Sequence, residues 1–274
     1  MLWNIEEHYL RPGVRMYNNL KTLFYNGEKL WEGDDEYFGL LEFAEEPAHP
    51  LIYNREERNS WQQIMVLPGV EEILTCTFQG CINVEKVVMY DVRWIRSKAY
   101  MYCDSLRRIV FSRNLELIES NGISDCKSLP SIFLPESCRE IRDFAFIRCP
   151  RLMIVTVPHH TEIDGDAFED TALDAHYCMR LSLFERFRFR LNDWIKNINV
   201  EEEYSLHRAC SSSTPSEEII YQIMKEQGGP KAFTEPNTIE ITPSQYLSEN
   251  PFAEHIKEKS LIQRYILEMM GETV

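Results

Sequence analysis

Apolar residues recur at a fixed spacing of 22 or 23 residues between about residues 64 and 174. The clearest column is cysteine: Cys81, Cys103, Cys126 and Cys149. An isoleucine column keeps the same spacing at Ile73, Ile95, Ile118, Ile141 and Ile163. A third column, mostly aromatic and three residues before the cysteine slot, contains Phe78, Tyr100, Ile123, Phe146 and Phe168. A unit this short cannot bury its own apolar side chains, so the spacing predicts about five stacked repeats that share one continuous core.

Each repeat contains one stretch in which apolar and other residues alternate. Its apolar members are Val87 and Met89, Ile109 and Phe111, Ile132 and Leu134, and Val155 and Val157. Alternation with a period of two predicts a short strand that faces the core with every second residue and pairs in parallel with its neighbours. Prolines at 68, 135 and 158 follow these stretches, where a missing N–H group ends a strand at little cost.

The repeat resembles the BspA-type leucine-rich repeat. The fourth copy, from Ile141 through Phe146, Cys149 and Leu152 to Pro158, matches that pattern most closely. The third copy has Ile123 in the aromatic slot. The fifth copy has Thr171 in the cysteine slot, and such a departure is typical of the last repeat in a stack. The resemblance covers residues 64–174 and implies recognition of another protein, without catalysis or a cofactor.

Residues 1–63 are rich in aromatic and acidic side chains. Within them, Leu23 to Trp31 reads as two short strands about an Asn26-Gly27 turn, which indicates a hairpin. A solenoid needs its first open edge covered, so we expect this region to be an N-terminal cap. An aromatic docking patch is the alternative.

Residues 175–274 lose the period and adopt helical spacing. Segment 205–209 (Ser-Leu-His-Arg-Ala) resembles the start of an ankyrin helix, and helix-start signals of the Thr-Pro-Ser type begin at Thr214 and Thr242. The expected fold is therefore α+β: a leucine-rich repeat solenoid with a hairpin cap and a helical, ankyrin-like tail. Such a combination is similar to a large family of protist repeat proteins.

The formal net charge is −15 and the isoelectric point is near 5.0. An acidic surface repels phosphates and anionic lipids, so we expect neither nucleic acid nor a membrane as a partner. The first residues carry acids where a secretory leader needs positive charge, and no apolar run reaches the length of a membrane span. Together these features predict a cytoplasmic protein.

Several residues could carry chemistry, and each has a simpler structural explanation. The cysteines lack the close pairs of a zinc site, so we expect them to be reduced core residues, although disulfides along the column remain geometrically open. His159-His160 and the Asp164–Asp166 loop are weak metal candidates, and we expect no metal. Three arginines, Arg186, Arg188 and Arg190, predict a solvated helix face.

The outward positions of the repeat strands form the candidate partner-binding surface. One row contains Met65, Val88, Val110, Phe133 and Thr156, and a second contains Lys86, Arg108, Ser131 and Ile154. An apolar row on an open sheet indicates either a partner surface or a surface covered by the terminal regions. We therefore expect a non-enzymatic protein-interaction scaffold or adaptor. The alternatives are a cysteine hydrolase that uses Cys210 and His207, or a structural oligomerising protein.

Overall fold

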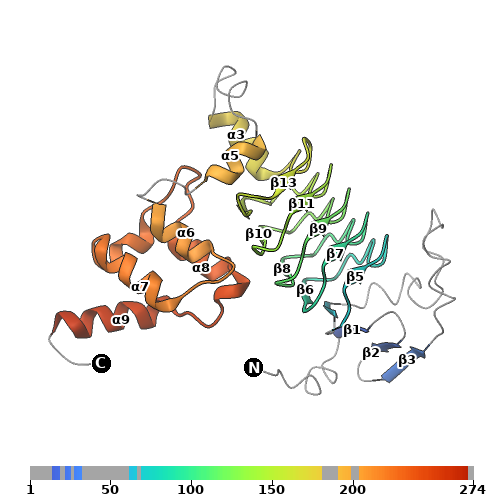
Figure 1. The fold of residues 1–274 in the computed structure, drawn as a ribbon, viewed down its shortest axis with the longest axis horizontal. Helices are drawn as coiled ribbons and strands as arrows, with labels where there is room; N and C mark the ends of the chain where they lie inside the picture. Colours follow the sequence, from blue (N-terminus) through green and yellow to red (C-terminus); the bar gives the residue numbers. More distant parts are fainter. Residues whose placement is uncertain are drawn as a thin grey trace.

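The computed structural model describes residues 14–18, 22–25, 28–32, 62–66, 69–180, 191–198 and 204–270. Its central part is a solenoid with the predicted parallel strands, and helices follow toward the C-terminus (Figure 1). The repeat strands are β4 (Gln63–Val66), β6 (Lys86–Met89), β8 (Arg108–Val110), β10 (Ser131–Phe133) and β12 (Ile154–Thr156). Successive strands pair in parallel from β4 to β8, and β10 pairs in parallel with β12.

The isoleucine column forms a second parallel sheet that the sequence did not predict. Its strands are β5 (Glu72–Ile73), β7 (Trp94–Ile95), β9 (Leu117–Ile118), β11 (Glu140–Ile141) and β13 (Glu162–Ile163). The register aligns each isoleucine with the isoleucine of the next repeat. A strand of two residues is too short to show alternation, so its periodicity is invisible in the sequence.

The predicted shared core is present between the two sheets. The side chains of the cysteine column are completely buried, as are those of Ile73, Ile95, Ile118 and Ile141. The rings of Phe78 and Tyr100 stack with centroids 5.2 Å apart, and those of Phe146 and Phe168 with centroids 5.1 Å apart. Ile123 lies in the same column and interrupts this aromatic stack, as expected from the third copy.

Two positions in each of the first four repeats, and one in the fifth, adopt the left-handed backbone conformation. One column contains Cys76, Lys98, Asn121 and Phe144, and the other contains Gly80, Tyr102, Asp125, Arg148 and Asp170. Positive φ is disfavoured for most L-residues, and glycine, asparagine and aspartate occupy it most readily. The solenoid turn imposes this geometry even on Tyr102 and Phe144, because the stacking of neighbouring repeats determines where the chain must turn.

Three N-terminal strands extend the first sheet. They are β1 (Val14–Asn18), β2 (Thr22–Tyr25) and β3 (Glu28–Glu32). Strand β1 pairs in parallel with β4, and β2 pairs antiparallel with both β1 and β3. The predicted strand pair about Asn26-Gly27 is therefore present as β2 and β3, while the turn itself lies outside the described residues.

The last repeat leads directly into helices. Helix α3 (Ala172–Arg180) follows Thr171, whose hydroxyl accepts a hydrogen bond from the backbone N–H of Asp174 at 3.0 Å. Thr171 occupies the cysteine slot of the fifth copy, so this substitution supplies a helix start where the solenoid ends. Helix α5 (Leu191–Asn197) follows, and Arg186, Arg188 and Arg190 lie outside the described residues.

The remaining helical elements are α6 (Ser205–Ser211), α7 (Glu217–Glu226), the 3₁₀ turn η4 (Gly229–Thr234), α8 (Pro243–Glu249), the 3₁₀ turn η5 (Pro251–Ala253) and α9 (Glu258–Met269). Thr242 caps α8 in a complete capping box with Gln245, as predicted. The expected cap of α7 at Thr214 is wrong: Ser216 is the N-cap and accepts from the N–H of Ile219.

Glycines end α7 as predicted. Gly228 adopts φ of 98°, the left-handed conformation that commonly follows a helix. Gly229 permits a close approach, because a Cβ atom there would lie 2.8 Å from the Tyr265 ring of α9. None of the described helices combines the length and apolar character that crossing a membrane requires.

Candidate functional site

The first sheet brings the candidate partner-binding residues into rows. Its register aligns Met65, Val88 and Val110 across β4, β6 and β8, and Lys86 with Arg108. Strands β10 and β12 pair with each other as a separate two-stranded sheet, in which Phe133 aligns with Thr156 and Ser131 with Ile154. The alternate residues Val87, Ile109, Ile132 and Val155 are buried in the core. All nine candidates therefore lie on the opposite, outward face of these strands.

Part of this face is not exposed. Phe133 is 1% exposed, and Ser131, Ile154 and Met65 are also buried. Five candidates keep partial exposure: Lys86, Val88, Arg108, Val110 and Thr156. The surface is therefore partly exposed over β6 and β8, and largely closed over β10.

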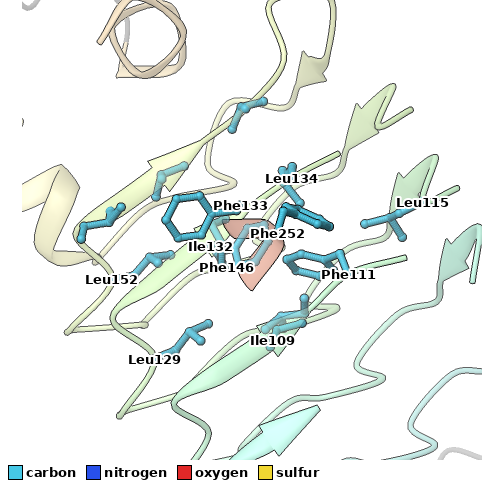
Figure 2. Packing of buried hydrophobic residues seen from close by; sticks show 14 of the residues in the cluster. Ile109, Phe111, Leu115, Leu129, Ile132, Phe133, Leu134, Phe146, Leu152 and Phe252 are labelled. Atoms are coloured by element: carbon cyan, nitrogen blue, oxygen red, sulfur yellow. The ribbon is translucent and has the colours of Figure 1, made fainter. Parts of the chain in front are cut away.

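The C-terminal helical region covers the part of this face that is closed over β10. In Figure 2 the ring of Phe252, from η5, lies among the labelled side chains between Phe111 and Phe133, and all three belong to one buried cluster. Phe252 is 8% exposed, and η5 contacts β8. Burying an aromatic ring in this way contributes about 1.5–3 kcal/mol through the hydrophobic effect. The alternative of a covered surface therefore holds for Phe133 and its neighbours.

Polar contacts accompany the covering helices. The hydroxyl of Ser131 donates to a carboxylate oxygen of Glu249 at 3.1 Å. Arg108 forms an ion pair of 2.9 Å with Glu254, and the guanidinium of Arg113 lies 6.0 Å from the centroid of the Phe252 ring. These contacts fix which part of the tail lies over β8 and β10. The Arg108–Glu254 pair is partly exposed to solvent, so we assign most of the stabilisation to the apolar contacts.

Neighbouring repeats are joined by the cysteine column. The thiols of Cys103, Cys126 and Cys149 each donate a hydrogen bond of 3.3 Å to a backbone carbonyl in the preceding repeat. All eight cysteines are free thiols. Cysteine suits this slot because it is small and apolar yet can satisfy a buried carbonyl. No group of His, Cys, Asp or Glu in the described part of the chain has the arrangement of a metal site.

The proposed hydrolase pair lies in the tail core. Nε2 of His207 donates to the backbone carbonyl of Glu235 at 2.9 Å, and burial lowers the pKa of this imidazole. The side chain of Cys210 is completely buried, and burial raises the pKa of its thiol far above the usual value. An activated nucleophile needs a lowered thiol pKa and access to substrate. Both residues therefore have structural roles: His207 anchors the loop around Glu235, and Cys210 packs inside the helices.

We expect Cys178 to be alkylated by iodoacetamide far faster than the other seven cysteines of the native protein. Cys178 is exposed, whereas the others are buried, and burial raises the pKa of Cys138 to about 12. The thiolate is the reactive species, so burial slows the reaction through both access and ionisation. Peptide mass spectrometry after timed alkylation measures each rate. Rapid labelling of Cys210 in folded protein would contradict its structural role.

The weak metal candidates of the sequence lie on two loops, one after β12 and one after β13. His159 and His160 are both exposed on the loop after β12. The amide of Asn192 in α5 donates to the backbone carbonyls of Ile163 and Asp164 at 3.2 and 2.9 Å. These bonds give the Asp164–Asp166 loop a structural attachment to α5.

Sequence reasoning missed the contribution of η5 to the candidate surface. The only local signal is Asn250-Pro251 at the end of α8: Asn250 accepts a hydrogen bond from the N–H of Phe252 at 2.9 Å and so starts the turn. That signal identifies a turn but not what the turn packs against.

Comparison with known proteins identifies the repeat. Residues 57–175 match, in 6 copies, a family model described as "BspA type Leucine rich repeat region". The solenoid is therefore similar to this repeat family over that stretch. The matched stretch contains the repeats predicted from the sequence and ends within α3, so the helices from α5 onward lie outside it. No curated protein matches the chain.

Solved leucine-rich repeat proteins resemble the chain over part of its length. A leucine-rich repeat protein of T. pallidum is 28% identical over 41% of this chain and 56% of its own, with a TM-score of 0.39. A leucine-rich cell surface protein of Faecalibacterium prausnitzii is 28% identical over 41% and 31%, with a TM-score of 0.38. A leucine-rich repeat protein of Bacteroides ovatus is 20% identical over 57% and 38%, with a TM-score of 0.39. The chain thus spans only about a third to just over half of these proteins.

Proposed function

We propose that the protein is a non-enzymatic scaffold or adaptor that binds another protein through the open part of its first sheet. The observation that carries the proposal is the apolar pair Val88 and Val110, which stays partly exposed beside Lys86 and Arg108 while Ser131 and Phe133 are buried. Apolar groups flanked by charge on a rigid sheet are suited to protein recognition. The leucine-rich repeat fold supports the proposal, since such repeats commonly mediate protein interactions.

Two further features belong to the proposal. We place the protein in the cytoplasm, because the cysteine column uses S–H groups as donors and therefore requires reduced thiols. We also propose that the tail is a degenerate ankyrin-like unit. Support comes from the contact of α6 with α8 and from the hydrogen bond by which His207 holds the following loop.

Affinity capture tests the proposed surface. A partner captured from the lysate of the cells that express the protein should be lost when both Val88 and Val110 are replaced by glutamate. The melting temperature should stay within a few degrees of the wild type, because both side chains are only partly buried. Ile266→Glu on the exposed side of α9 is the matched control and should keep the partner. Equal capture by all three proteins would rule out this surface, and self-association of the wild type alone would favour an oligomerising role.

A further inference from the structure

A pocket of about 470 Å³ lies between the end of the solenoid and the C-terminal helices. Strand β12 and the loop after it form one wall, and α5, α6 and the first turns of α7 form the other. This volume is within the usual range for pockets that bind small molecules. The site is separate from Val88 and Val110, and neither the family match nor the repeat pattern assigns it a role.

One part of the pocket is apolar. Val155, Ile195, Ile198, Ile219 and Ile223 line it. Ile219 is 57% exposed, and Ile223, one helical turn further along α7, is partly exposed on the same side. Aliphatic side chains left open to solvent inside a concave wall favour an apolar ligand group, because binding removes them from water.

The other part of the pocket has donors for an anion. Ser213 is only 5% exposed, and its hydroxyl has no hydrogen-bond partner among the described residues. Lys196 also lines the pocket and is half-buried there. A buried hydroxyl without a partner destabilises the protein, and a ligand oxygen that accepts from it would remove that cost.

The charge of the lining also differs from that of the whole chain. Acidic residues outnumber basic ones by 44 to 29 overall. Counted in the same way, the described lining of the pocket holds one carboxylate, Glu136, and two cations, Lys196 and Arg208. A local excess of basic groups in an acidic protein favours a negatively charged ligand.

We propose that this pocket binds a small amphipathic acid, a molecule with an aliphatic body and one carboxylate. The aliphatic body packs against Ile195, Ile219 and Ile223. The carboxylate pairs with the Lys196 ammonium and accepts a hydrogen bond from the Ser213 hydroxyl. The inference goes beyond the proposed protein-binding function and does not depend on it.

Calorimetric titration of the full chain with sodium decanoate tests the proposal. Decanoate should bind at one site per chain, and decan-1-ol, which has the same aliphatic chain without the charge, should bind at least about ten-fold more weakly, as expected for the loss of one charged hydrogen-bonded contact. Lys196→Gln should weaken decanoate binding about ten-fold and leave decanol binding unchanged. Ile223→Ser should weaken both.

Lys231→Gln is the matched control, since Lys231 is an exposed lysine on η4 outside the pocket. It should bind decanoate as the wild type does, and all variants should keep the wild-type melting temperature. Equal binding of decanoate and decanol would overturn the proposal. So would several weak sites per chain, or the same decanoate affinity for Lys196→Gln and Lys231→Gln. Loss of the partner in affinity capture, by contrast, bears only on the protein-binding surface.

Discussion

Replacing Phe133 with glutamate should lower the free energy of unfolding by about 4–6 kcal/mol. The ring is 1% exposed and belongs to the cluster that also contains Phe111 and Phe252 (Figure 2). The substitution removes the aromatic packing and places a carboxylate without a cationic partner under the tail. Urea denaturation, followed by circular dichroism, measures the loss.

Val110→Glu is the matched control for this experiment. Val110 occupies the same position of the preceding repeat but is partly exposed, so we expect a loss of only about 1 kcal/mol. From the repeat pattern alone the two substitutions would be equivalent, since both residues belong to the outward row. Equal and small losses would show that the tail does not cover β10 in solution.

Asn250→Asp should lower the free energy of unfolding by about 3–5 kcal/mol at neutral pH. The Asn250 side chain is 1% exposed, and its amide donates to the carbonyls of Cys210 and Ser212 at 2.9 and 2.7 Å. Aspartate has nearly the same shape but, when ionised, cannot donate. Its second oxygen would face two carbonyl oxygens in a buried site, so the connection between α6 and the η5 turn would fail.

Asn114→Asp provides the control, because Asn114 is exposed after β8 and should tolerate the charge with little change. Chemical denaturation of both variants gives the two free energies. A loss below about 1 kcal/mol for Asn250→Asp would mean that these buried hydrogen bonds do not hold the tail in its place.

The solenoid could be predicted because a repeat presents the same information several times. A single apolar residue at 87 or 109 is ambiguous, but columns that hold their spacing over several copies specify both stacking and the inward face. The change from cysteine to Thr171 likewise marked the end of the stack, and the structure adds its physical reason, the cap of α3.

Local conformation within the repeat was harder to predict. The strands of the second sheet have only two residues each, and the left-handed positions accept residues as different as Gly80, Tyr102 and Arg148. At these sites the stacking of repeats overrides local preference. Residue type therefore carries little signal, although Asn121, Asp125 and Asp170 are typical of that conformation.

The candidate site could be predicted only in part, because exposure depends on contacts remote in sequence. The alternation of β8 and β10 correctly placed Val110 and Phe133 on one face. Whether that face is open depends on Phe252, more than 100 residues later, and no local pattern connects the two. The pocket beside β12 has the same origin, since its walls come from the solenoid and from three helices.

Hydrogen exchange of the intact protein tests the central claim most directly, namely that the solenoid and the C-terminal helices share one core. Protection of the β10 amides, Ser131–Phe133, should be lost together with that of the α6 amides, Ser205–Ser211, at the same urea concentration. Phe252→Ala should shift both to lower urea by the same amount. If α6 instead exchanged freely while β10 stayed protected, the helices would be an independent unit and the account of a covered sheet would be wrong.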